Sequence, residues 1–135
     1  MPIDKNRDSW KPGESWDKAL DELEYIRGLA REMGGPERIK RQHDGGRYTI
    51  RERIDRFVDE DSFFEAGPLV GAAEYDADGN LTEFLPGAYV MGMGKIDGRP
   101  IAIGGDDFTI SGGSPHNVHK GQGQFTQRLS LQYGI

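Results

Sequence analysis

The stretch that decides the fold is GKIDGRPIAIGGDDFTISGGS, residues 94–114. Near its start, Asp97-Gly98 is a dipeptide typical of tight hairpin turns, because both residues tolerate the positive φ angles that such turns need. The turn joins two arms, residues 88–96 and 100–103, that are rich in apolar and β-branched side chains. This part of the chain therefore predicts an antiparallel β-hairpin.

The hairpin leads into a glycine-rich loop. Phe108–Ile110 predicts a third short strand, which continues into Ser111-Gly112-Gly113-Ser114, and a helix is expected from His116 to Tyr133. Backbone amides that are approached through glycines at the start of a helix can hold an anion or an oxyanion. A strand-to-helix turn that simply needs small residues explains the same pattern. Both interpretations stay open on spacing alone.

Helices are predicted on the N-terminal side of the hairpin. Ser15 is a suitable N-cap, and the helix that follows runs to Met33 and ends at Gly34-Gly35-Pro36. Residues 36–44 predict a second, short helix, and Thr49–Glu52 forms a capping box that starts a third. The apolar face of the first helix comprises Trp16, Ala19, Leu20, Leu23, Ile26, Ala30 and Met33.

The hydrophobic core is expected to form between these helices and the strands. A second hairpin is predicted at Asp78-Gly79. The apolar stripe of the third helix comprises Ile50, Ile54, Phe57 and Val58. The aromatic and methionine residues assigned to the core are Trp16, Phe57, Phe63, Phe64, Met91 and Met93.

Composition limits the class of protein. The chain has 135 residues, which suits one domain. Its apolar runs are too short to cross a membrane, and its polar start does not resemble a signal peptide. Without cysteine it can form no disulfide, iron–sulfur cluster or cysteine-ligated zinc site, and it fits a reducing compartment. The formal net charge of −6 argues against bulk nucleic-acid binding.

Charge is unevenly distributed along the chain. Residues 27–56 hold nine Lys/Arg and five Asp/Glu, with His43 in their midst. This basic region can bind phosphates or form the solvated faces of two helices. His116 and His119 lie one helical turn apart, downstream of Asp106-Asp107, but three histidines without cysteine make a poor metal site. These two histidines are interpreted as surface or capping groups, and no metal is expected.

Two ordered blocks resemble a known family. Residues 34–67 and 94–114 resemble the N-terminal portion of the carboxyltransferase β-subunits of biotin-dependent acyl-CoA carboxylases (propionyl-, acetyl- and methylcrotonyl-CoA carboxylase type). In the first block the matching residues are Arg38, Ile39, Gln42, His43, Gly46, Thr49, Arg51, Glu52, Arg53, Ile54, Asp59, Ser62, Phe63 and Glu65. In the second block they are Asp97, Gly98, Arg99, Pro100, Asp107, Phe108, Thr109, Gly112, Gly113 and Ser114.

The resemblance implies an α/β fold, namely a crotonase/ClpP-like (ββα spiral) N-terminal half-domain that is preceded by helices and incomplete in this chain. The layout it implies is a polar tail at 1–14, N-terminal helices at 15–60, and the start of the crotonase-like domain at 61–135. In this family, CO2 carried on biotin moves to the α-carbon of an acyl-CoA. The coenzyme A thioester is the substrate, and the biotin belongs to a separate carrier domain or subunit.

The resemblance also implies the site residues. Ser111, Gly112, Gly113 and Ser114 are expected to line the acyl-CoA side of the site. Arg51, Arg53 and His43 are expected to contact phosphate or a subunit interface. No catalytic residue is expected in this chain, because the family's oxyanion-hole amides come from a later glycine-rich turn.

The sequence departs from the family pattern at the glycine loop. Pro115-His116-Asn117 follows the loop where the family has LGE, and Ser111 replaces an apolar or aromatic residue. These changes leave the preference for the acyl chain open.

The chain is expected to be a fragment or one chain of a split enzyme, inactive alone, because it stops before the family's biotin-receiving half. The expected partners are acyl-CoA, a complementary carboxyltransferase half, and a biotin carboxylase or biotin carrier subunit. They would form a cytoplasmic homo- or hetero-oligomer, without nucleic acid or membrane. Two alternatives stay open: the same fold run as a biotin-dependent decarboxylase, or a non-catalytic assembly subunit of a split carboxylase.

Overall fold

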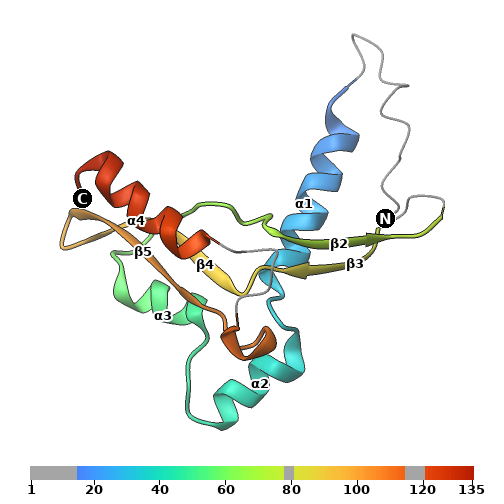
Figure 1. The fold of residues 1–135 in the computed structure, drawn as a ribbon, viewed down its shortest axis with the longest axis horizontal. Helices are drawn as coiled ribbons and strands as arrows, with labels where there is room; N and C mark the ends of the chain where they lie inside the picture. The colour runs from blue at the N-terminus through green and yellow to red at the C-terminus, as the bar shows by residue number, and fades with distance from the viewer. Residues whose placement is uncertain (1–14, 78–80, 115–120) are drawn as a thin grey trace.

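The computed structural model describes residues 15–77, 81–114 and 121–135 (Figure 1). The predicted tail at 1–14, the Asp78-Gly79 turn, and both His116 and His119 lie outside the described residues. The helices are α1 (Asp17–Arg31), α2 (Pro36–Asp44), α3 (Ile50–Phe57) and α4 (Gln122–Tyr133), with a 3₁₀ turn η2 (Ser111–Gly113). The strands are β1 (Phe64–Glu65), β2 (Gly71–Tyr75), β3 (Leu81–Pro86), β4 (Tyr89–Ile96) and β5 (Arg99–Asp106).

The hairpin predicted around Asp97-Gly98 is confirmed as β4 and β5. These strands pair antiparallel, and β1 pairs with the other side of β4, so the order in this sheet is β1-β4-β5. Asp97 and Gly98 have φ angles of 51° and 75°, the positive values that the turn dipeptide tolerates. The carboxylate of Asp59 accepts both turn amides, at 2.9 Å from the Asp97 nitrogen and 2.8 Å from the Gly98 nitrogen. This carboxylate ties the hairpin tip to the segment after α3.

Helices α3 and α4 cover opposite faces of the β4–β5 pair. An added Cβ at Gly105 would meet the Ile50 side chain of α3 at 2.5 Å, so α3 packs directly on the strand backbone there. The neighbouring residue, Gly104, points to the other face, because side chains alternate along a strand. There a Cβ would meet Met91 at 3.1 Å, and the Thr126 hydroxyl of α4 donates to the Met91 sulfur at 3.5 Å. The glycines of β5 therefore allow both helices to approach closely.

Helix α1 packs on a second hairpin, formed by β2 and β3, and its N-terminal end projects away from the rest of the chain (Figure 1). Ala30, near the C-terminal end of the predicted apolar face, is buried, whereas Leu20 near the other end is exposed. The start of the helix differs slightly from the prediction. Trp16 occupies the N-cap position, and the Ser15 hydroxyl accepts from the Asp17 amide at 3.1 Å.

The prediction of a third strand at Phe108–Ile110 is wrong, because these residues form a turn. Oδ1 of Asp107 accepts from the Thr109 amide at 2.9 Å and from the Thr109 hydroxyl at 2.6 Å. An aspartate that bonds the backbone two residues on favours a turn over an extended strand. The predicted C-terminal helix is confirmed from Gln122 to Tyr133.

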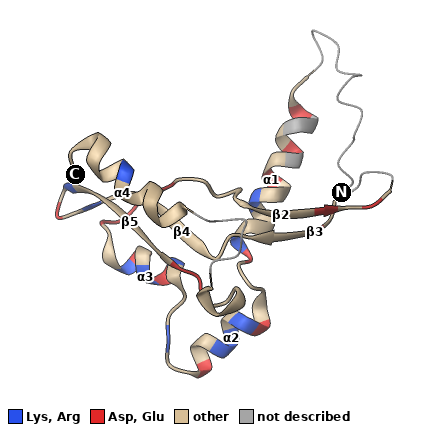
Figure 2. Cartoon of the chain, in the orientation of Figure 1, with Lys and Arg blue, Asp and Glu red and all other residues tan. Residues whose placement is uncertain are grey.

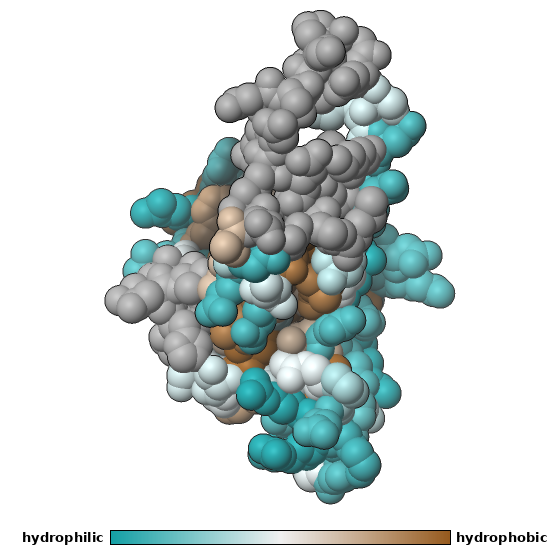
Figure 3. Space-filling model, turned by 90° about the vertical axis from the view of Figure 1, so that its right-hand side faces the viewer, coloured by the Kyte–Doolittle hydropathy of each residue, from teal (hydrophilic) through white to brown (hydrophobic). Residues whose placement is uncertain are grey.

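The core is smaller than the sequence predicts. Trp16, Phe57 and Phe64 are 64%, 64% and 69% exposed, so their assignment to the core is wrong. Phe64 lies on the short edge strand β1 and points away from Phe63, whose ring faces Gly92 of β4. Phe57 is the last residue of α3, and Trp16 precedes the projecting end of α1. Figure 3 shows hydrophobic side chains at the centre of one face of the molecule. The buried hydrophobic residues are Ala30, Ile54, Ala88, Val90, Met91, Ile110 and Leu129.

A buried polar network joins the two sequence blocks. The Gly34 amide donates to the Thr109 hydroxyl at 2.9 Å, and that hydroxyl donates to Asp107 at 2.6 Å. Asp107 and Thr109 are 1% and 2% exposed. An added Cβ at Gly34 would clash with the carbonyl oxygen of Thr109, so this approach requires glycine.

Replacing Gly34 with alanine should lower the free energy of unfolding by about 2 kcal/mol, because the segment must shift and weaken its hydrogen bond to Thr109. Urea titration followed by circular dichroism measures the change. Gly28→Ala is the matched control, since Gly28 lies within α1 and an added Cβ there has nothing within 4 Å. That variant should be as stable as the parent or slightly more so. Equal stabilities for the two variants would contradict the role of the Gly34 contact.

Candidate functional site

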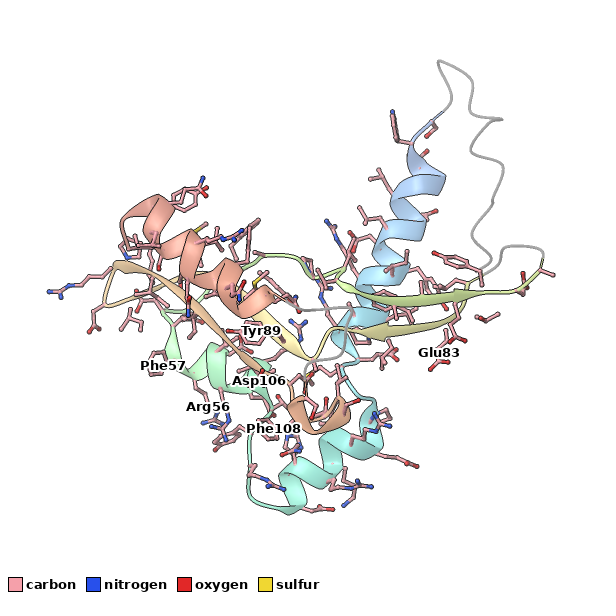
Figure 4. The ribbon with its side chains drawn as sticks, viewed as in Figure 1. Arg56, Phe57, Glu83, Tyr89, Asp106 and Phe108 are labelled. Carbon is pink, nitrogen blue, oxygen red and sulfur yellow. The ribbon has the colours of Figure 1, made fainter. Side chains whose placement is uncertain are left out.

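A cavity of about 310 Å³ lies where the two sequence blocks meet. One wall is formed by the end of α2, the loop that follows it and the first turns of α3. The other wall is the end of β5 and the turn that follows it, which contribute Asp106 and Phe108, both labelled in Figure 4. From the first wall, the side chains with charged, amide or aromatic groups are Gln42, Arg47, Tyr48 and Arg53.

The glycine loop expected to hold acyl-CoA forms a compact turn beside this cavity. Ser111, Gly112 and Gly113 have consecutive positive φ angles of 46°, 65° and 77°. The amides of Gly113 and Ser114 donate within the loop, to the carbonyl oxygens of Ile110 at 2.8 Å and of Ser111 at 3.2 Å. These two amides are therefore committed to holding the loop in shape. The assignment of Ser111–Ser114 to acyl-CoA stays a prediction.

Phe108 connects the glycine loop to the cavity. Its ring atoms lie 3.3 Å from the position that a Cβ would take at Gly113, and the same side chain lines the cavity. At Gly112, by contrast, an added Cβ would meet no atom of the described residues within 4 Å. The loop therefore packs on Phe108 through Gly113, and the described residues leave the space around Gly112 open.

The structure places Arg51 away from solvent, in an ion pair. Its two terminal nitrogens donate to the two carboxylate oxygens of Glu65 at 2.7 and 2.8 Å, and the side chains are 23% and 19% exposed. Such a two-pronged pair is the strong form of the arginine–carboxylate interaction. It joins α3 to β1, and its geometry gives Arg51 a structural role.

Arg53 and His43, which were predicted together with Arg51, point to two other places. Arg53 lines the cavity, where its Nε donates to the Tyr48 carbonyl oxygen at 3.3 Å. His43 Nε2 lies 3.0 Å from both carboxylate oxygens of Glu52, at the start of α3. In the cartoon of Figure 2, basic residues of this region lie on α2 and α3, and acidic residues lie on α1 and β2–β3. The structure therefore separates the three predicted residues into three environments.

The predicted capping box at Thr49 is confirmed. The Thr49 hydroxyl accepts from the Glu52 amide at 3.3 Å, and the Glu52 carboxylate accepts from the Thr49 amide at 2.7 Å. Hydrogen bonds from the Thr49 amide, from His43 and from the Thr49 hydroxyl lower the pKa of Glu52 from 4.5 to about 2. Each of these bonds favours the charged carboxylate.

This lowered pKa predicts a loss of stability in acid. A carboxylate whose folded-state pKa is depressed stabilises the fold above its unfolded pKa, and the contribution disappears as the pH falls from about 4.5 to about 2. The parent chain should therefore exceed the Glu52→Gln variant in unfolding free energy at pH 6, and the difference should shrink towards pH 2. Urea titrations of both proteins across this range measure it. If the difference in unfolding free energy between the two proteins stayed constant with pH, the lowered pKa of Glu52 would be contradicted.

Residues 15–77, 81–114 and 121–135 contain no group of three or more His, Asp and Glu side chains placed to hold a metal ion. None of the helices described is long and apolar enough to cross a membrane.

Comparison with known proteins gives the chain a family. Residues 41–131 match the family model described as the carboxyl transferase domain. The chain is 39% identical over 102 residues to the propionyl-CoA carboxylase beta chain of Roseobacter denitrificans, which covers 74% of this chain and 20% of that protein. It is 36% identical over 102 residues to the methylmalonyl-CoA decarboxylase subunit alpha of Veillonella parvula, covering 75% of this chain and 20% of that protein. The chain therefore spans about one fifth of the length of these relatives.

Solved structures show the same fold. A crystal structure of transcarboxylase 12S, described as a hexamer with methylmalonyl-coenzyme A and methylmalonic acid bound, matches with a TM-score of 0.74 and 28% identity over 90% of this chain and 24% of that chain. The fold is the crotonase-like α/β fold of carboxyltransferases, as predicted. The chain belongs to the carboxyl transferase domain family.

Several residues that line the cavity were not predicted from the sequence to be part of a functional site. Gln42 and Phe108 were noted only as matches to the family pattern, and Tyr48 was not singled out. Each of the two motif blocks supplies one wall of the cavity. Because both blocks belong to one family pattern, residues from the two blocks could have been expected to lie close together. Which of their side chains face the cavity depends on the turn at Phe108–Ile110, which was predicted to be a strand.

Proposed function

We propose that this chain forms the acyl-CoA side of a carboxyltransferase that moves CO2 from carboxybiotin to the α-carbon of an acyl-CoA. Residues 15–60 are its N-terminal helices and residues 61–135 are the start of its crotonase-like domain. The chain acts in the cytoplasm with a complementary carboxyltransferase half and a biotin-carrying subunit, and it is inactive without them.

One observation carries this proposal. The two family motifs fold against each other through Gly34, Thr109 and Asp107, and the glycine loop lies directly beside that junction. The backbone is similar, over 90% of the chain, to that of a transcarboxylase whose structure has methylmalonyl-coenzyme A bound. Family membership and this likeness support an acyl-CoA as the ligand class.

The chemistry assigns the loop a positioning role. Carboxyl transfer passes through a thioester enolate, whose negative charge is stabilised best by donors that are fixed before the reaction begins. The loop Ser111–Ser114 would hold the acyl-CoA so that its α-carbon faces the carboxyl donor. Carboxybiotin supplies the CO2 when it is delivered by its carrier. The oxyanion donors come from the family's later glycine-rich turn.

Transfer in the opposite direction is the second candidate. The relative from Veillonella parvula is named as a decarboxylase subunit and is nearly as similar to this chain as the propionyl-CoA carboxylase beta chain. In that use of the fold, biotin accepts CO2 from a malonyl-type thioester. A non-catalytic role in assembly is the third candidate.

Reconstitution tests the proposal and separates the alternatives. The chain is purified with any polypeptide that accompanies it and is assayed, alone and as this complex, for biotin-dependent carboxylation of propionyl-CoA and decarboxylation of methylmalonyl-CoA. We expect no turnover by the chain alone and carboxylation by the complex. Decarboxylation without carboxylation would favour the second candidate. A stable complex that includes a complementary carboxyltransferase half and catalyses neither reaction would leave only the assembly role.

A further inference from the structure

Helix α1 carries one line of side chains along its whole length. Residues 16, 20, 23, 27 and 30 are spaced alternately by four and three residues, so they share one face of the helix. At the C-terminal end of this line, Ala30 is buried. At the other end, on the part of α1 that projects from the chain in Figure 1, Trp16 and Leu20 are 64% and 53% exposed. The projecting end therefore presents large apolar side chains to solvent.

The C-terminal end of the same line borders a hollow of about 510 Å³. Arg27, Ala30 and Arg31 of α1 form one side of it. Phe63 and Phe64 contribute to the other side, and Phe64 is 69% exposed. The volume lies within the range of small-molecule sites. A hollow that combines phenyl rings with guanidinium groups is suited to an aromatic side chain, which packs on both.

Charge is divided between the two halves of α1. Residues 17–24 contain four acids and one lysine, whereas residues 25–31 contain two arginines and no acid. Arg27 pairs with Glu24 of the same helix. Among the side chains that the structure describes, neither Asp17 nor Arg31 forms an ion pair. Glu32 follows the helix at a position about 160° around the axis from Trp16, so it faces away from the line.

An antiparallel arrangement of two α1 helices matches these features. Each Asp17 then lies beside the partner's Arg31, and each Leu20 lies on the carbon chain of the partner's Arg27. Each Trp16 reaches the hollow at the far end of the other helix. A two-fold axis repeats every contact, so both hollows are occupied. A parallel pair would place the two acidic halves side by side, which like-charge repulsion disfavours.

We propose that α1 is an interface between two copies of this chain, which pair antiparallel and insert each Trp16 into the hollow at the end of the other helix. Apolar burial supplies most of the affinity, because exposed charge pairs contribute little. The charges select the orientation. Tryptophan and arginine are also the residues that most often dominate the energy of an interface. The inference does not depend on the proposed function, since it uses no contact of the glycine loop.

Cysteine cross-linking tests the pairing, because the chain contains no cysteine of its own. Asp17→Cys and Arg31→Cys chains are produced separately and together, purified with any polypeptide that accompanies them, and mildly oxidised. We expect a disulfide-linked dimer when both are present and none from either alone. In the antiparallel pair the two copies of residue 17 are about 21 Å apart, from a rise of 1.5 Å over 14 residues. A disulfide cannot span that distance.

The mixed dimer keeps one Asp17–Arg31 charge pair, so the cross-linking itself does not remove the proposed contact. Non-reducing gels and the mass of the product identify a dimer of the 15.0 kDa chain. Efficient cross-linking by either variant alone indicates a different orientation and overturns the proposal. The absence of a dimer when both variants are present also overturns it.

A variant of Leu20 tests the apolar part of the interface. Leu20→Asp, introduced into both cysteine chains, should lower the rate of cross-linking at least tenfold. Leu131→Asp is the matched control, because Leu131 is 84% exposed on α4, and it should leave the rate within twofold. Circular dichroism checks that each variant is folded, and Leu20→Ala replaces Leu20→Asp if the latter is not. Equal rates for the Leu20 and Leu131 variants contradict the interface.

The two proposals can fail separately. A reconstituted enzyme that transfers CO2 but whose chains do not cross-link through α1 retains the proposed function and rejects this inference. Cross-linking of residue 17 to the partner's residue 31, in a preparation without turnover, does the reverse.

Discussion

Replacing Arg51 with methionine should lower the free energy of unfolding by about 3 kcal/mol, because it leaves Glu65 as an unpaired charge in a site that is only 19% exposed. Arg51 and Glu65 form two parallel hydrogen bonds between α3 and β1, at 2.7 and 2.8 Å. Methionine retains much of the side-chain volume, so most of the loss comes from charge and hydrogen bonding. Urea titration followed by circular dichroism measures the change.

Two further variants separate the ion pair from a general effect of charge. Arg53→Met removes the same charge from a residue that is exposed on the same helix, and it should cost less than 1 kcal/mol. The double variant Arg51→Met with Glu65→Leu should recover most of the lost stability, since neither partner then remains buried and unpaired. If the Arg51 and Arg53 variants were equally stable, the pair would not hold α3 to β1.

Replacing Gly112 with valine should reduce carboxyl transfer by the assembled enzyme about 100-fold, the scale expected when a substrate is displaced by about 1 Å. Gly112 has φ of 65°, and the space around its missing Cβ is open, so a valine side chain would extend into the region proposed for the acyl-CoA. Steady-state rates of propionyl-CoA carboxylation, measured on the complex with its complementary half, give the effect.

The strain of valine at positive φ needs its own control. Gly134→Val is suitable, because Gly134 has φ of 68° and also has nothing within 4 Å of an added Cβ, but it follows α4 at the end of the chain. Both variants carry similar backbone strain, and only the Gly112 variant should lose activity. Near-normal turnover by Gly112→Val would remove Ser111–Ser114 from the acyl-CoA site.

Most of the local structure could be predicted because it depends on residues close in sequence. The Thr49–Glu52 capping box and the Asp97-Gly98 turn are complete within four residues, and both are confirmed. Phe108–Ile110 was mistaken for a strand because its apolar and β-branched residues favour one. The Asp107 side chain instead bonds to Thr109, and that bond is supported by Gly34, 75 residues away. The turn therefore combines a local aspartate bond, which competes with the strand propensity, with a partner that is distant in sequence.

The sequence by itself determined the family, the order of the helices, and the β4–β5 hairpin with its turn, because these follow from short motifs and from hydrophobic periodicity. Only the tertiary structure decided what each motif residue contacts. Arg51 and Arg53 are two positions apart on one helix, yet the first is paired with Glu65 and the second lines the cavity. The physical reason is that neighbouring helical positions point in different directions, so their partners depend on which strand packs beside them.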